Sequence, residues 1–162
     1  MKTFLCLFLG FFSLSPVTLE PQKAPPLPPI VVTTKKVKPT KINHQAAKAK
    51  LLGTHKFEVR DVRGDYRSIA TVTEQQGVLS LQAQQFFSKG LGGQSIIDGI
   101  ITEVNAHSFK FKGRVSIETH DFVCEREGVF LFRVHEKQKL WRMQRMSGRC
   151  GQVTTAVDIH FR

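Results

Sequence analysis

Six histidines and three cysteines are the residues of this chain with the most obvious chemistry, and their spacing restricts what that chemistry could be. They form no HxH or HExxH pattern and no cluster at zinc-ligand spacing, so we predict no metal site and no cofactor. Two histidines lie near an acid: His120 precedes Asp121, and His160 follows two residues after Asp158. A His/Asp pair could act as general base and acid, but a surface turn and an edge strand also carry such residues. We therefore predict no catalytic residues, and a hydrolytic enzyme that uses a His/Asp pair is kept as an alternative.

The first residues have the pattern of an export signal. Met1 and Lys2 precede an uncharged apolar run, Thr3–Leu14, whose length is typical of a signal-peptide core. We predict a signal peptide over residues 1–19 and a secreted or periplasmic protein. Pro16 would be the first residue after the expected cleavage site, where proline is poorly accepted. An uncleaved anchor therefore remains the alternative. That run is shorter than the ~20 residues of a spanning helix, and membrane contact would be confined to this N-terminal segment.

Two cysteines remain after this signal, Cys124 and Cys150. In an exported chain they are most simply read as a disulfide. One precedes and the other follows a predicted strand pair around Phe130 and Trp141, so both lie at one end of a hairpin, where the Cα spacing of about 5.5 Å is reachable. Such a crosslink would stabilise the fold by about 3–4 kcal/mol on the chain-entropy model. A reactive thiol pair is disfavoured because the spacing is not CxxC.

Composition divides the rest of the chain into a linker and a domain. Residues 20–50 hold most of the prolines and seven lysines against one acid, Glu20. Such a segment can neither continue a helix nor form a core, so we predict a flexible linker over 20–50. Its lysines could also tether the protein to an anionic surface, with up to about 1 kcal/mol of attraction for each lysine.

The domain predicted over residues 51–162 contains no proline and alternates between apolar and polar residues. Phe109, Phe111, Val115 and Ile117 share one face of a long strand, and Gly113 falls on the same face, where a sheet can bend. The same alternation predicts further inward residues at Phe130, Phe132, Val134, Trp141, Met143, Val157, Ile159 and Phe161. Residues 82–87 fit either a short helix or a continued strand.

Roughly eight such strands, joined by short turns, predict an all-β antiparallel meander. A meander with one apolar face closes best as a small lipocalin-like barrel or as a two-sheet sandwich, and we prefer the barrel.

The C-terminal forty or so residues resemble an uncharacterised family of short secreted bacterial proteins. The residues that carry the resemblance are Cys124-Glu-Arg-Glu-Gly-Val-Phe130, Leu140-Trp-Arg-Met-Gln144, Cys150-Gly151 and Val157-Asp-Ile-His-Phe161. The family pattern has a cysteine, an aromatic-Trp-Arg-Leu-Gln strand, a second cysteine and a Val-Asp-Ile-aromatic strand. Leu140 and Met143 depart from it. The resemblance implies export and a lipocalin-like or related small β fold, and it implies no catalytic residues.

An outward basic face is the candidate binding surface. Its members are Lys110, Lys112, Arg114, Arg133, Arg142, Arg145 and Arg149. If their strands are neighbours, these cations form a stripe that could bind an anionic envelope component or a secreted protein. A solvated sheet face with interspersed acids is the alternative. Nucleic acid is a poor partner because the aromatic residues face inward, and a small apolar ligand requires a hollow barrel.

The sequence therefore favours a non-enzymatic binding or interaction module of the cell envelope or the secreted space. Inhibition of a secreted hydrolase is an alternative within this class, since small stapled β domains suit rigid inhibition.

Overall fold

Alternating apolar and polar residues build a closed barrel in the computed structural model, which describes residues 37–60, 68–87, 92–120, 122–144 and 156–161. Within these ranges, eight antiparallel strands, β2 to β9, close on themselves in a meander, and β9 returns to pair with β2. The strands are β2 Gly53–Val59, β3 Ile69–Gln75, β4 Val78–Phe87, β5 Gly93–Asn105, β6 Ser108–Thr119, β7 Val123–His135, β8 Leu140–Met143 and β9 Val157–His160. The predicted all-β barrel is confirmed.

The interior is occupied by one cluster of buried side chains to which each strand of the barrel contributes. Phe109 and Phe132 stack with ring centroids 4.6 Å apart, and Trp141 lies 4.5 Å from Phe161. The inward residues predicted from alternation are buried or packed against this cluster. Residues 82–87 belong to β4, so the strand alternative was correct there. The three hollows considered below are lined by residues on the outside of the barrel.

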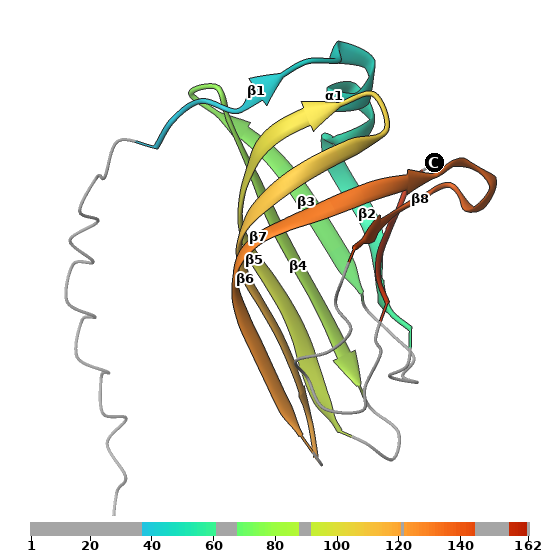
Figure 1. The fold of residues 1–162 in the computed structure, drawn as a ribbon. Coiled ribbons are helices and arrows are strands. Elements are labelled where there is room, and N and C mark those ends of the chain that lie inside the picture. Colours follow the sequence, from blue (N-terminus) through green and yellow to red (C-terminus); the bar gives the residue numbers. More distant parts are fainter. Residues whose placement is uncertain (1–36, 61–67, 88–91, 121, 145–155, 162) are drawn as a thin grey trace, which may run out of the picture. The chain divides into compact units, whose positions relative to one another are not determined.

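The segment before β2 belongs to the domain, which corrects the predicted linker. Strand β1, Lys41–Ile42, pairs in parallel with the end of β5, and α1, Gln45–Leu51, follows it. Figure 1 shows α1 at the end of the barrel where β5 turns into β6. Leu51 and Ala47 join the core cluster from this helix. The boundary expected at residue 51 is therefore too late, because the lysine-rich composition concealed a short amphipathic helix.

Thr40 fixes this N-terminal segment to the barrel. Its hydroxyl donates to the carbonyl oxygen of Ile101 at 2.6 Å and accepts from the backbone N–H of Leu79 at 2.9 Å. The backbone N–H of Thr40 also donates to Gly77. The hydroxyl thus bridges β4 and β5 just where their mutual ladder ends, so residues 38–41 are held beside the outer surface of the barrel.

Three glycines lie side by side across neighbouring strands, Gly99 on β5, Gly113 on β6 and Gly128 on β7. A Cβ on Gly99 would collide with the carbonyl oxygen of Lys112 and lie 2.9 Å from the Phe111 ring. A Cβ on Gly113 would likewise lie 2.6 Å from that ring. The strands bend along their length in Figure 1. A bend at Gly113 itself stays a prediction.

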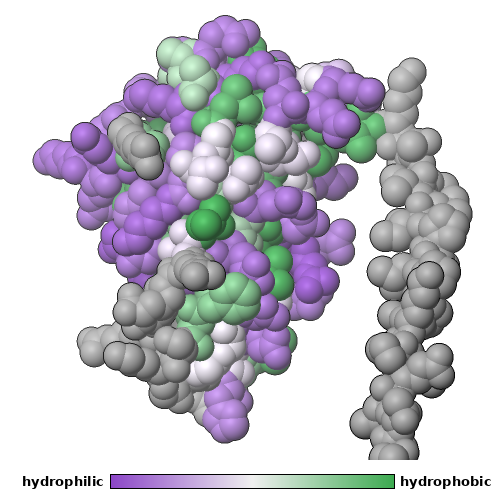
Figure 2. All heavy atoms as spheres, turned by 180° about the vertical axis from the view of Figure 1, so that it is seen from behind, coloured by the Kyte–Doolittle hydropathy of each residue, from purple (hydrophilic) through white to green (hydrophobic). Residues whose placement is uncertain are grey.

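None of the helices in the described ranges has the length and apolar character needed to cross a membrane. Figure 2 shows one face of the surface, where apolar side chains form small patches between hydrophilic ones.

The glycine row predicts a graded response to added methyl groups. Gly99→Ala and Gly113→Ala should each lower the free energy of unfolding by about 1–3 kcal/mol, because the new Cβ overlaps backbone atoms and the Phe111 ring. Gly128→Ala is the matched control and should stay within about 0.5 kcal/mol, because nothing lies within 4 Å of its added Cβ. Urea denaturation measures all three, and equal losses would show that the packing of Phe111 is not the cause.

Candidate functional site

The predicted basic face is broken up by acids from neighbouring strands. Lys110 Nζ lies 2.7 Å from Glu103 Oε2, and Arg114 Nε lies 3.4 Å from Glu125 Oε1. The hydrogen bond from Lys110 holds the pKa of Glu103 below its usual range, and the charges of Lys110 and Lys41 act in the same direction. The solvated alternative therefore describes this part of the surface better than a continuous cationic stripe. Arg145 and Arg149 lie outside the described residues.

Arg142 is a bracing residue between two strands. It donates to Asp158 through Nε at 2.7 Å and through Nη2 at 2.8 Å, while Arg60 Nε donates to the same carboxylate at 2.7 Å. The side chain of Asp158 is 0% exposed, and its hydrogen bond to Arg142 raises the pKa of that guanidinium above its usual range. The charge of Arg142 is thus used to hold β8 to β9, which makes it a weak member of the predicted binding face.

The histidine and acid pairs are arranged differently from the catalytic alternative. His160 Nε2 lies 3.0 Å from Glu58 Oε2 on the neighbouring strand β2, and Asp158 is held by its two arginines. Asp121, the partner expected for His120, lies outside the described residues. Within the described ranges no group of three or more His, Cys, Asp or Glu side chains is placed to hold a metal ion.

Cys124 is buried at the start of β7, at 5% exposure. Its predicted partner, Cys150, lies outside the described residues, so their disulfide stays a prediction.

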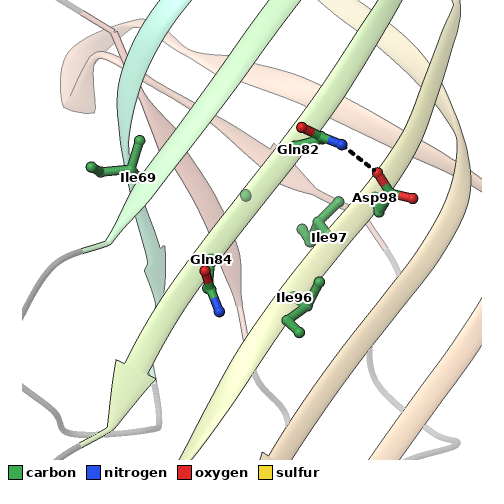
Figure 3. A pocket seen from close by; sticks show the side chains of 7 residues that line it. Ile69, Gln82, Gln84, Ile96, Ile97 and Asp98 are labelled. Carbon is green, nitrogen blue, oxygen red and sulfur yellow. Dashed lines mark hydrogen bonds between the residues drawn. The ribbon is translucent and has the colours of Figure 1, made fainter. Parts of the chain in front are cut away.

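A shallow hollow of about 410 Å³ crosses β3, β4 and β5 on the outside of the barrel (Figure 3). We call it the β3–β5 hollow; its lining includes Ile69, Gln82, Gln84, Ile96, Ile97 and Asp98. Gln82 Nε2 donates to Asp98 Oδ1 at 3.1 Å across its floor. Among its described lining residues there is no cation, and the carboxylate of Asp98 already has a donor, so these residues offer little to an anionic partner.

A second hollow, of about 610 Å³, runs along β7 next to Gln144. Arg133, another member of the predicted face, lines it. The residues that follow Gln144 lie outside the described part of the chain, so no site is built on this hollow.

The third hollow is a groove of about 930 Å³ between the N-terminal segment and the outside of β5, β6 and β7. One wall is formed by Val37, Lys38, Pro39 and Lys41. The other holds Ile100, Thr102, Lys112 and Glu127 beside the backbone of the three glycines. We call this site the lysine groove. The described lining of this groove contains three lysines and one carboxylate.

Lys112 differs from the other basic residues of β6 in what lies beside it. Its cross-strand neighbours are Ile100 on β5 and Val129 on β7, whereas Arg114 lies between Asp98 and Glu127. Lys112 and Lys38 are exposed, and neither makes an ion pair with any residue that the structure describes. Val129 is 64% exposed, so an apolar track continues past Lys112.

Lys112 is the one described member of the predicted binding face that lines the lysine groove. Lys38 and Lys41 were missed because they were assigned to the linker. The sequence does contain one indication of helix α1: Ala47 and Leu51 are four residues apart and so share a helix face. The helix begins after the N-cap His44, whose Nδ1 accepts from the Ala47 N–H at 3.1 Å.

Comparison with known proteins gives a family match and a similar relative. The model of the PM1083 family matches residues 39–161. The chain is 32% identical over 117 residues to the protein named "Uncharacterized protein PM1083" from Pasteurella multocida (strain Pm70), a match that covers 69% of this chain and 74% of that protein. No solved structure matches the chain. The family match begins near Thr40, which agrees with the corrected start of the domain.

The cluster around Asp158 predicts that Asp158→Asn will lower the free energy of unfolding by about 3 kcal/mol, because two arginines then face each other without a carboxylate. Glu125→Gln is the control and should cost less than about 1 kcal/mol, since its pair with Arg114 is exposed. Urea midpoints at constant m report both values. A loss for Asp158→Asn no larger than that for Glu125→Gln would contradict the bracing role.

Proposed function

The chain belongs to the PM1083 family, and from its lysine groove we propose that it is a non-enzymatic binding module that recognises an anionic component of the cell envelope. The observation that carries this proposal is the environment of Lys112. Its cross-strand neighbours are apolar, so its charge is not neutralised by the sheet as the charges of Lys110 and Arg114 are.

The second support is the way in which the groove collects charge from two parts of the chain. Lys38 and Lys41 are held beside Lys112 by the β1 pairing and by the Thr40 hydroxyl. Lys41 is shared with Glu103, whose pKa it lowers, which leaves Lys38 and Lys112 as the stronger attraction for an anion. Clustered cations above a low-dielectric wall raise the local concentration of anionic partners.

Geometry gives less support to the catalytic alternative. The His160–Glu58 pair lies on the outer surface of two adjacent strands, and neither residue lines any of the three hollows. Asp158 is fully engaged by Arg60 and Arg142, so it is not available to orient a histidine.

The proposed setting is the secreted or periplasmic space. The apolar run over Thr3–Leu14 supports export, and the lysines before residue 37 add positive charge next to the groove in sequence. An anionic envelope surface would attract both parts, and salt would weaken the attraction.

The binding proposal is tested with vesicles that contain phosphatidylglycerol. The chain lacking its signal should bind them at low salt and not bind vesicles of phosphatidylcholine. The double variant Lys38→Gln/Lys112→Gln should bind at least about tenfold more weakly, since each lysine near an anionic surface contributes about 1 kcal/mol. Co-sedimentation at several salt concentrations measures the difference.

The matched control is Lys56→Gln/Lys137→Gln, which removes the same charge from exposed lysines outside the groove. Equal weakening in the two double variants would mean that net charge, and not the groove, governs binding. Absence of binding at low salt would contradict the proposed function.

Export and the disulfide form a separate prediction. When the full chain is produced in a bacterial host, we expect it outside the cytoplasm, shortened at its N-terminus, with Cys124 and Cys150 unreactive to alkylation until they are reduced. Mass spectrometry of the alkylated protein decides this. Cytoplasmic chain in which Cys124 and Cys150 both react without reduction would contradict both the proposed location and the proposed pair.

A further inference from the structure

We infer that the lysine groove binds a single-chain anionic amphiphile, with its carboxylate or phosphate head at Lys38 and Lys112 and its alkyl chain along the apolar wall. This inference rests on the proposed function and names the class of ligand that the same site would take.

The lining of the groove carries the first step. Cations stand next to apolar side chains, with Val37 50% exposed on one wall and Ile100 on the other. A hydrated polyanion would engage the lysines and leave Val37 and Ile100 in water. A ligand with a charged head and an alkyl chain would satisfy both kinds of surface, and burial of the chain adds free energy that salt does not screen.

The backbone of the sheet carries the second step. Gly99, Gly113 and Gly128 line the groove, and a Cβ on Gly99 or Gly113 would point to the inner side, toward the Phe111 ring. On the groove side these residues therefore present backbone between the outward side chains of their neighbours. Beside the groove, Val129 lies opposite Lys112 on β7 and is 64% exposed. A linear chain with its head at the lysines therefore meets apolar surface at Ile100 within the groove and at Val129 next to it.

Size carries the third step. The groove has about 930 Å³, and pockets for small ligands usually have about 300–1,000 Å³. One chain fits this volume better than a folded partner does. Each wall offers a contact to the head and one to the alkyl chain, because Lys38 follows Val37 on one wall and Lys112 lies opposite Ile100 on the other.

The probes are dodecanoate, dodecyl phosphate, decanoate, acetate, the uncharged detergent dodecyl maltoside and polyglutamate, each below its micelle concentration and added to the chain lacking its signal. Isothermal titration calorimetry should show one molecule of dodecanoate or dodecyl phosphate for each chain. Decanoate should bind more weakly, by up to about fourfold for each missing methylene. Acetate and dodecyl maltoside should not bind. The relative affinity of dodecanoate and dodecyl phosphate tells whether a fatty acid or a phosphate-headed lipid is the better ligand.

The decisive variant is Ile100→Ser, which removes apolar surface from the groove without changing charge. It should weaken dodecanoate about tenfold and leave vesicle binding through the lysines nearly unchanged. Its matched control is Ile96→Ser, four residues earlier on the same strand and outward in the β3–β5 hollow (Figure 3), which should leave dodecanoate affinity unchanged.

Several results would overturn the inference. If affinity does not depend on chain length, or if Ile100→Ser and Ile96→Ser behave alike, the alkyl chain does not lie in the groove. If polyglutamate binds through Lys112 and dodecanoate does not, the occupant is an acidic peptide. If vesicles bind in a lysine-dependent way and dodecanoate does not, the amphiphile inference is wrong and the proposed function stands. If neither binds, both are wrong.

Discussion

Closure of the barrel depends on the ion pairs of one buried carboxylate. The strands that close the sheet are short: β8 and β9 have four residues each, while β5 has 13. So short a strand supplies few ladder hydrogen bonds. Asp158, in the middle of β9, compensates by accepting from Arg142 on β8 and from Arg60 next to β2. One side chain therefore ties β9 to both of its neighbours, at the point where an open sheet would otherwise have two edges.

Burial strengthens these ion pairs and also makes the carboxylate depend on them. A carboxylate that is removed from water must recover its solvation from donors, and Asp158 recovers it from three guanidinium N–H groups. Trp141 and Ile159, which flank this pair on β8 and β9, point into the core. The Trp-Arg and Val-Asp-Ile segments noted in the sequence thus act together: the apolar members fill the barrel, and the charged members lock the two strands from outside.

The sequence predicted what depends on local periodicity and missed what depends on register. Alternation identified the inward faces of β6, β7, β8 and β9, and it placed Gly113 on the inward face of β6, because strand parity is readable within a single segment. It could not tell that Glu103 and Glu125 would lie beside Lys110 and Arg114, since those acids come from other strands. It also gave residues 37–50 to the linker, because their packing onto β5 depends on the Thr40 hydroxyl and on contacts about 60 residues away in the chain.

The dependence on strand register also explains which charges the lysine groove contains. A surface charge is neutralised where the register places an acid beside a base. A cation that is available to a partner is therefore one whose cross-strand neighbours are not acids. On β6 this happens at Lys112, which lies one residue before Gly113 and between two apolar side chains. The three glycines line the groove beside Lys112, and the segment tied down by Thr40 supplies the opposite wall with two further lysines. The groove therefore arises where that segment packs along the sheet, while its charge is left over from the pairing of the strands around it.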